Sequence, residues 1–390
     1  MEITPAIPDT CLQKLIGIAN NDSLDIVTII KDYAYYKNIS LNHDTLKSLL
    51  NLNQKQIDTL FLENIENNAL RPIFLNMGAN INTTKEKNQN CLWYTTDPHI
   101  LKELINKGAT VDAKNIANHT ILHILCYYFK YSDDIKYLGS VEVLLKDGKA
   151  DPNIPFSSIS GCSLLYKTID CAKDNIKFKA VELLCKYGAH CNEQSSLTDS
   201  PLILAIEKEL PDIVELLLEN KANPNLPVQN TPNALHKRSP LQIALKEPRI
   251  NKNSKLIKLP IVNSKIIILL LHYGANPNEF YGPTKNSPLH VAVLLNLPDV
   301  IRELIQCGAN KNYRNNEGYT AFDLAQSQTS YNGIISTEII KLLNPNSIDI
   351  ASPTQQPKIT INSSSPSNKN TISSHSSKNK KKEDTGCFQQ

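Results

Sequence analysis

A short phrase that recurs through the middle of the chain constrains its fold more than any other feature. The phrase is an apolar run, then Gly-Ala or a variant, then Asn or Asp. Apolar residues at i, i+3 and i+4 form one face of a helix, and the glycine stands where a helix ends in the left-handed conformation. A repeated phrase of this kind predicts an array of stacked helical units. The phrase occurs at Met77–Asn82, Lys107–Asp112, Asp147–Asn153, Tyr187–Asn192, Asn220–Asn225, Tyr273–Asn278 and Cys307–Asn312.

A second phrase lies between copies of the first and marks the start of a helix. It begins with Ser or Thr, followed in three copies by Pro, and continues as a short apolar run. Ser and Thr cap helix N-termini, and Pro at the first helical position lacks only an amide proton that the helix cannot use. The small Ala within the run lets a paired helix approach closely. The copies are His119–Leu125, Ser200–Ile206, Ser239–Leu245, Ser287–Val293 and Tyr319–Ala325.

Together the two phrases resemble the ankyrin repeat, whose first helix starts Thr-Pro-Leu-His-x-Ala and whose period is about 33 residues. Ala189 and Ala222 lie 33 residues apart, and longer intervals elsewhere predict inserted loops, including one near residues 127–139. The resemblance covers residues 61–343, with six or seven irregular repeats. It implies an all-α solenoid whose groove and turn tips bind another, still unidentified, protein.

The sequence lacks the patterns of known catalytic or metal sites. No nucleophile elbow, P-loop, HExxH or CxxC pair is present, so we expect no catalytic residue, no metal and no cofactor. The nine cysteines are scattered without zinc-site spacing and are expected to be reduced thiols, mostly in the core. His123 and His290 fall at the His position of the ankyrin motif, where the resemblance implies structural hydrogen bonds. The pattern therefore favours a binding protein over an enzyme.

The charge of the chain is small and unevenly placed. Lys and Arg number 41 against 38 acidic residues, a net charge of +3. Residues 345–390 hold six lysines and three acidic residues, so this excess belongs to them and the remainder is neutral. A nucleic-acid-binding protein usually carries a dense basic face, so no nucleic-acid partner is expected.

Residues 1–60 contain neither phrase and are predicted to form three short helices, the first opened by Pro8. This segment resembles an F-box: Ile7 and Pro8 stand for the Leu-Pro of that family, and apolar residues follow at helical spacing. The resemblance implies that the segment binds the Skp-type adaptor of cullin-RING ubiquitin ligases. The alternative is a helical cap on the first ankyrin repeat. The implied adaptor contacts are Ile7, Pro8, Leu12, Leu15, Ile16, Leu24 and Val27.

Residues 344–390 are rich in Ser, Asn, Pro, Gln and Lys and are predicted to be disordered. Cys387, four residues from the end of the sequence, resembles the cysteine of a CaaX prenylation box. The lysine cluster at 378–382 would add electrostatic attraction to an anionic membrane surface. The alternatives are a solvated tail with an incidental cysteine, or a secretion signal.

An F-box-like segment, ankyrin repeats and a CaaX-like end, in this order, resemble secreted effectors of intracellular bacteria. The resemblance implies a protein delivered into a host cell, acting in its cytoplasm or at a membrane. There the F-box would recruit the ubiquitin ligase and the ankyrin groove would select the target. The alternative is a non-enzymatic ankyrin scaffold that tethers or blocks a host protein, with residues 1–60 serving only as a cap.

Overall fold

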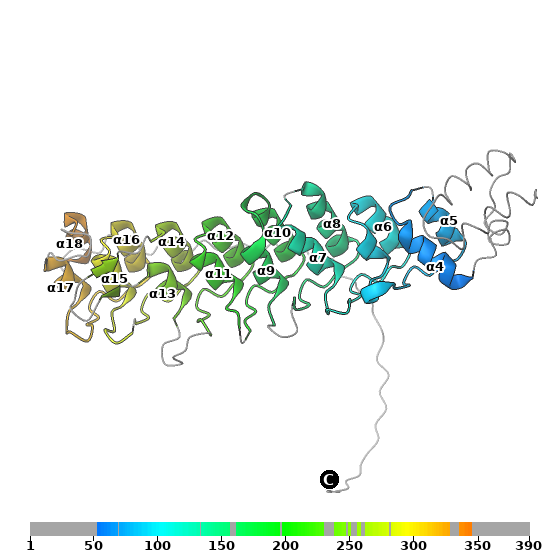
Figure 1. Ribbon diagram of the computed structural model, residues 1–390. Coiled ribbons are helices and arrows are strands. Elements are labelled where there is room, and N and C mark those ends of the chain that lie inside the picture. The colour runs from blue at the N-terminus through cyan, green and yellow to red at the C-terminus, as the bar shows by residue number, and fades with distance from the viewer. Residues whose placement is uncertain are drawn as a thin grey trace, which may run out of the picture. The chain divides into compact units, whose positions relative to one another are not determined.

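A computed structural model describes residues 53–344, apart from gaps at 69, 133, 157–160, 196, 230–237, 247–248, 251–255, 259–261, 281 and 328–334. Within this part of the chain, helices stack side by side in two rows, and long loops project from one side of the stack (Figure 1). The row beside the loops, here called the loop-side row, contains the first helix of each pair. The other row, here called the outer row, contains the second.

Eight helical pairs follow one another from Gln54 to Leu343. The first pair is α4 (Gln54–Glu63) and α5 (Leu70–Asn76). The later loop-side members are η2 (Cys91–Tyr94), α7 (Ile121–Tyr128), α9 (Leu164–Cys171), α11 (Pro201–Glu207), α13 (Pro240–Leu245), α15 (Pro288–Leu294) and α17 (Ala321–Gln326). The later outer members are α6 (Pro98–Asn106), α8 (Ile135–Lys146), α10 (Asp174–Lys186), α12 (Pro211–Glu219), α14 (Ser264–His272), α16 (Pro298–Gln306) and α18 (Thr337–Leu343).

The structure confirms an all-α solenoid and differs from the sequence analysis in three details. The array begins at Gln54, inside the predicted N-terminal segment, which makes one or two more pairs than predicted. The loop expected at residues 127–139 is shorter than predicted, because α7 ends only at Tyr128 and α8 already starts at Ile135. Two short antiparallel strands, β1 (Arg249–Ile250) and β2 (Leu256–Lys258), lie between α13 and α14, and a short 3-10 turn, η1 (Glu86–Asn88), precedes η2.

Helix starts and ends follow the local chemistry of the two phrases. The Ser200 hydroxyl accepts a hydrogen bond from the Ile203 amide, and Pro201 occupies the first helical position of α11. Gly188, Gly274 and Gly308 have φ of 91°, 89° and 89°, so they end their helices in the predicted left-handed conformation. Each pair thus folds as a helix, a turn and a second helix, with its apolar faces buried against its neighbours.

A ladder of asparagine side chains joins successive repeats where the loops begin. At five of these junctions, the asparagine that ends one copy of the first phrase makes two hydrogen bonds to the backbone of the next copy, and we call such a step complete. Asn192, for example, donates from Nδ2 to the Lys221 carbonyl at 3.0 Å and accepts from the Asn223 amide at 2.7 Å. An asparagine fits because its amide supplies both a donor and an acceptor. The same pair of bonds is made by Asn82, Asn153, Asn225 and Asn278.

One step of the ladder is incomplete, because Asp112 stands where the others have Asn. Its carboxylate accepts from the Asp151 amide at 3.3 Å. An ionised carboxylate cannot donate to the Lys149 carbonyl, which occupies the place of the Lys221 carbonyl. Burial, together with the charge of Asp151, raises the pKa of Asp112.

We expect Asp112→Asn to raise the free energy of unfolding by about 1 kcal/mol at neutral pH, because it adds one hydrogen bond. Because the pKa of Asp112 is raised in the folded protein, this residue contributes most to folding stability in acid. That contribution is lost as the pH rises above 3.8, the ordinary pKa of an aspartate. Urea denaturation at several pH values measures both effects, and the variant should lose this part of the pH dependence. An equal or lower stability at pH 7 would contradict the ladder argument.

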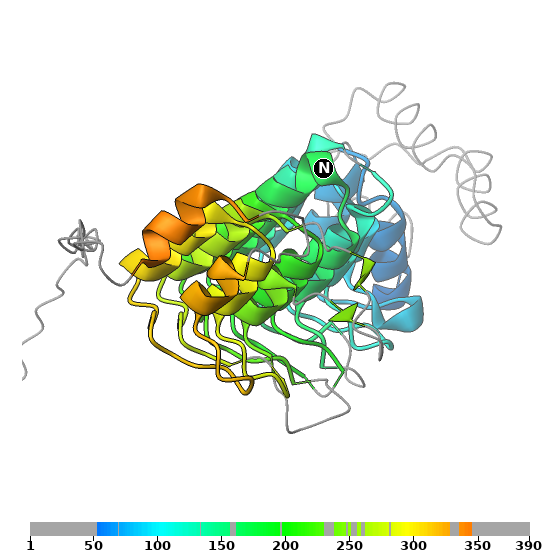
Figure 2. The same ribbon diagram turned by 90° about the vertical axis from the view of Figure 1, so that its left-hand side faces the viewer.

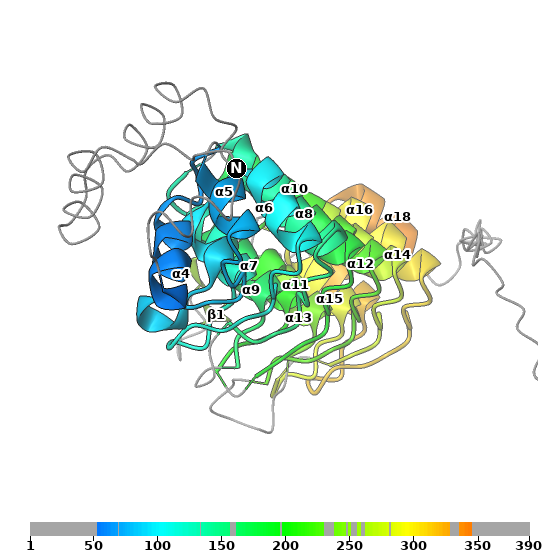
Figure 3. The same cartoon turned by 90° about the vertical axis from the view of Figure 1, so that its right-hand side faces the viewer.

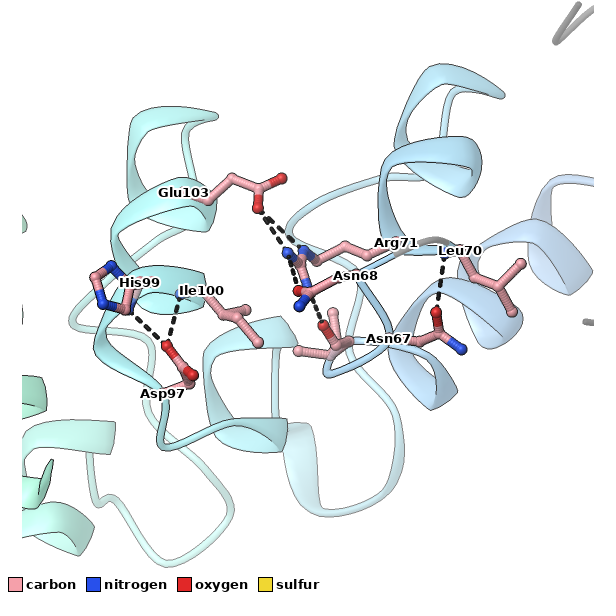
Figure 4. A network of polar contacts seen from close by, with 9 residues as sticks. Asn67, Asn68, Leu70, Arg71, Asp97, His99, Ile100 and Glu103 are labelled. Carbon is pink, nitrogen blue, oxygen red and sulfur yellow. Dashed lines mark hydrogen bonds and ion pairs between the residues drawn. The ribbon is translucent and has the colours of Figure 1, made fainter.

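A buried guanidinium connects the first two outer helices (Figure 4). Arg71, on α5, is 4% exposed and donates from Nε and Nη2 to Glu103 Oε2 of α6 at 3.2 and 2.8 Å. It also donates to the Ile65 carbonyl at 2.6 Å and to Asn68 Oδ1 at 3.0 Å. Three acceptors thus surround one buried charge, which is the condition under which such a charge can be tolerated.

Candidate protein-binding site

The loops between each outer helix and the next loop-side helix project from one side of the solenoid (Figures 2 and 3). Four of these loops carry a large apolar side chain that is about half exposed or more. Ile116 is 75% exposed, Leu197 64%, Phe280 51% and Tyr319 49%. Exposed apolar side chains on the loops of a repeat array are candidate contacts for a partner protein. We call these four residues the loop tips.

Hydrogen bonds hold the described loops in a defined shape. Asn115 Oδ1 accepts from the amides of Ala117 and His119, and Asn315 Oδ1 accepts from those of Glu317 and Tyr319. Neighbouring loops are also joined, since the Ile116 amide donates to the Lys87 carbonyl at 3.0 Å. A loop already fixed in the free protein loses less conformational entropy when a partner binds.

An aromatic cluster extends this surface to the end of α7. The Tyr127 and Tyr131 hydroxyls are 2.9 Å apart, and the Lys130 ammonium lies 5.3 Å from the Tyr131 ring centre. Phe156 packs against Tyr127 and His119, with ring centres 6.2 and 4.9 Å away. Tyr131 is 59% exposed. Tyrosines with a cation beside them are typical of the residues that dominate binding energy in protein interfaces.

The two motif histidines are structural, as predicted. In α7 the His123 Nδ1 lies 2.9 Å from the Thr120 amide and from its hydroxyl, and its Nε2 lies 2.9 Å from the Ile154 carbonyl. His290 makes the corresponding contacts to Ser287 and to the Tyr319 carbonyl. Burial lowers the pKa of His123 to about 4 and also lowers that of His290, so both rings are neutral at neutral pH.

The adaptor contacts predicted from the F-box resemblance, Ile7, Pro8, Leu12, Leu15, Ile16, Leu24 and Val27, lie outside the described residues, as does Cys387. The loop tips and the Tyr127–Tyr131 pair were not singled out from the sequence. Their sequence positions show only that they lie in turns. Whether an apolar side chain in a turn is exposed depends on the conformation of the loop, which the repeat motif does not specify.

Between residues 53 and 344, outside the gaps, no group of three or more His, Cys, Asp and Glu side chains is placed to hold a metal ion. None of the helices described in this range is long and apolar enough to cross a membrane.

Comparisons with known proteins agree with this fold. Family models of ankyrin repeats match residues 199–228 as one repeat and residues 260–354 as three copies. A putative ankyrin repeat protein of fowlpox virus is 34% identical over 176 residues, which is 42% of this chain and 42% of that protein. A putative ankyrin repeat protein of Acanthamoeba polyphaga mimivirus is 31% identical over 151 residues, 33% of this chain and 26% of that protein.

Two further similarities have less sequence identity. The phosphate system positive regulatory protein of Saccharomyces cerevisiae is 27% identical over 240 residues, 57% of this chain and 19% of that protein. The crystal structure of the human ASB11 ankyrin repeat domain is 22% identical, with a TM-score of 0.38, over 63% of this chain and 92% of that one. The chain spans less than half the length of each of the three sequence relatives.

The helical pairs, the capped helix starts and the family matches define an ankyrin-repeat solenoid. Ankyrin repeats of this kind indicate a protein–protein interaction scaffold.

Proposed function

We propose that the protein is an adaptor that binds a target protein with its loop tips and aromatic cluster. The observation that carries this proposal is the set of exposed apolar side chains on four loops, together with the exposed Tyr131 just after the end of α7. Apolar and tyrosine anchors on a fixed backbone supply binding energy at low entropic cost. This set therefore fits an extended protein surface better than a small molecule.

The experiment is co-purification of proteins from eukaryotic cells with the full chain. In one variant the loop tips Ile116, Leu197 and Phe280 are all changed to Ser. We expect the bound target to fall at least about tenfold, the equivalent of 1.4 kcal/mol. Ile135→Ser is the matched control, because Ile135 is 69% exposed but lies at the start of α8 in the outer row. Equal recovery from the loop variant and the control would refute binding at the tips.

We also propose that residues 1–60 recruit the Skp-type adaptor of a cullin-RING ubiquitin ligase, so that the bound target becomes ubiquitinated. The support is the F-box-like order of Ile7, Pro8 and the helical apolar residues after them. In a pull-down of the full chain with the purified Skp-type subunit, Ile7→Ala/Pro8→Ala should abolish detectable binding. Binding unchanged by the double variant would remove the F-box assignment.

The second candidate function is a scaffold that tethers or blocks its target without a ligase. It is favoured by the start of α4 at Gln54, since the helical array extends into the segment assigned to the F-box. In that case residues 1–60 cap the solenoid. Deletion of residues 1–52 would then lower the stability of α4 and α5 without changing target recovery.

We further propose that the protein acts inside a host cell, with Cys387 prenylated and the nearby lysines adding attraction to an anionic membrane. Of the three sequence relatives named above, two are viral and one is from yeast, so they do not favour bacteria as the source. Cys387→Ser should move the protein from the membrane fraction to the soluble fraction of eukaryotic cells. An unchanged distribution would mean that no lipid on Cys387 anchors the protein.

A further inference from the structure

Two outer helices are one turn longer than their neighbours. Counted from the alanine of the Gly-Ala turn that follows, α8 and α10 begin 15 residues earlier, at Ile135 and Asp174. The helices α6, α12, α14 and α16 begin only 11 residues before theirs. The extra turn makes a step in the outer row where α10 meets α12 (Figure 1).

A groove of about 580 Å³ lies at this step, between α10 and α12. Phe178 of α10 lines one wall and is 41% exposed; it follows directly after the extra turn, level with Pro211 at the start of α12. Ile213 and Leu216, both largely buried, supply apolar surface on the α12 side. The groove therefore presents an uncovered aromatic side chain in an apolar setting.

The rim of the groove is acidic. Asp212, Glu215 and Glu219 follow one another at spacings of three and four, and this places them on one face of α12. The Asp212 and Glu215 side chains are 73% and 44% exposed. A fourth carboxylate, Asp174, is 94% exposed and stands opposite on α10.

The described cations near the groove do not neutralise this rim. The Lys177 ammonium pairs with Asp174 at 2.9 Å and its side chain is only 10% exposed. Lys265 of α14 contacts Asp212 at 2.8 Å and Glu215 at 4.0 Å. Lys208 also acts on Asp174 and helps to lower its pKa, but it pairs with a further carboxylate, Asp170, at 3.2 Å. The carboxylates thus outnumber the lysines, which leaves a negative field beside the exposed Phe178.

We propose that this groove docks a basic amphipathic helix of a partner protein, separately from the loop tips. An apolar side chain of the helix would pack on Phe178 and Leu216, and its lysines or arginines would meet Glu215, Glu219 and Asp212. A helix that places apolar residues in a groove and charges on the rim is a recurrent mode of recognition. Opposite charge would mainly raise the association rate and select basic partners over acidic ones. The solenoid would then have two binding faces.

The test uses the full chain and a fluorescent synthetic peptide of about 15 residues, long enough to form an amphipathic helix of Leu and Lys. Fluorescence anisotropy should show saturable binding that weakens with added salt. A Leu/Glu peptide of the same pattern should not bind, and a Lys/Ser peptide should bind at least about tenfold more weakly, because it lacks the apolar anchor.

Two variants locate the site. Phe178→Ser and Glu215→Lys/Glu219→Lys should each weaken binding by about tenfold or more. The matched control, Glu66→Lys/Glu317→Lys, makes the same change in charge at exposed positions far from the groove and should bind within about twofold of wild type. An unchanged midpoint of thermal unfolding excludes misfolding of each variant. No saturable binding by wild type, or wild-type affinity in both groove variants, would overturn the proposal and leave binding at the loop tips untouched.

Discussion

Replacing Arg71 with Met should lower the free energy of unfolding by about 3 kcal/mol. The substitution removes the hydrogen bonds to Glu103 and Asn68 and leaves the Ile65 carbonyl without its donor. Loss of one member of a buried ion pair costs about 3–5 kcal/mol. We expect the lower end of that range, because the Glu103 side chain is 33% exposed and water can solvate its carboxylate. Urea denaturation followed by circular dichroism measures the change.

An exposed ion pair close by provides the control. Lys85 and Glu63 lie 2.7 Å apart with side chains 38% and 49% exposed, so Lys85→Ala should change stability by less than about 1 kcal/mol. The double variant Arg71→Met/Glu103→Gln should recover part of the loss, because no unpaired carboxylate remains. A loss below about 1 kcal/mol for Arg71→Met would show that the pair is not needed to hold α5 against α6.

Acid should destabilise the solenoid through His123. The pKa of this ring is lowered from 6.5 to about 4 by burial. Between these values the unfolded chain binds the proton and the folded chain does not, so stability is full above pH 6.5 and is lost as pH falls toward 4. At 1.36 kcal/mol per pH unit, the loss from this residue approaches about 3 kcal/mol. Chemical denaturation at a series of pH values measures it.

His123→Gln is the decisive comparison, because the chain already uses Gln at this place. Gln242 of α13 accepts from the Ser239 amide and donates to the Phe280 carbonyl, the same two roles that the histidine ring fills. The variant should keep most of the stability at pH 7 and lose about 3 kcal/mol less on acidification. An identical pH profile for the two proteins would mean that the acid sensitivity comes from other groups, such as His290.

Much of the solenoid was predictable because its signals are local. Ser200 and Pro201 start a helix and Gly188 ends one by rules that need only neighbouring residues. His123 and His290 were assigned structural roles correctly, since the motif around them specifies the hydrogen bonds. The repeat order then fixes which helices pack together.

The remaining features depend on contacts that the phrases do not encode. The pair α4 and α5 has neither Ser-Pro-Leu nor His at its start, and its cap is Asn53 with Gln56 instead. Trp93 stands at the histidine position of η2, where its indole Nε1 is buried and has no hydrogen-bond partner within the described residues. The outer-row step follows from the relative lengths of two neighbouring helices. Such a comparison requires register across repeats, which no single phrase supplies.

The asparagine ladder also determines how the protein should respond to tension. Successive repeats are held together both by the hydrogen bonds of the ladder and by the packing of their helices. A force that pulls the two ends of the solenoid apart acts on both. At Asp112 the ladder is reduced to a hydrogen bond from a single amide, at 3.3 Å, so the junction between α6 and α8 relies more on helix packing than the junctions with a complete pair of bonds do. A solenoid whose repeats contact only their neighbours yields at its weakest junction. Loss of this packing would separate the first two helical pairs from the six pairs between α7 and α18.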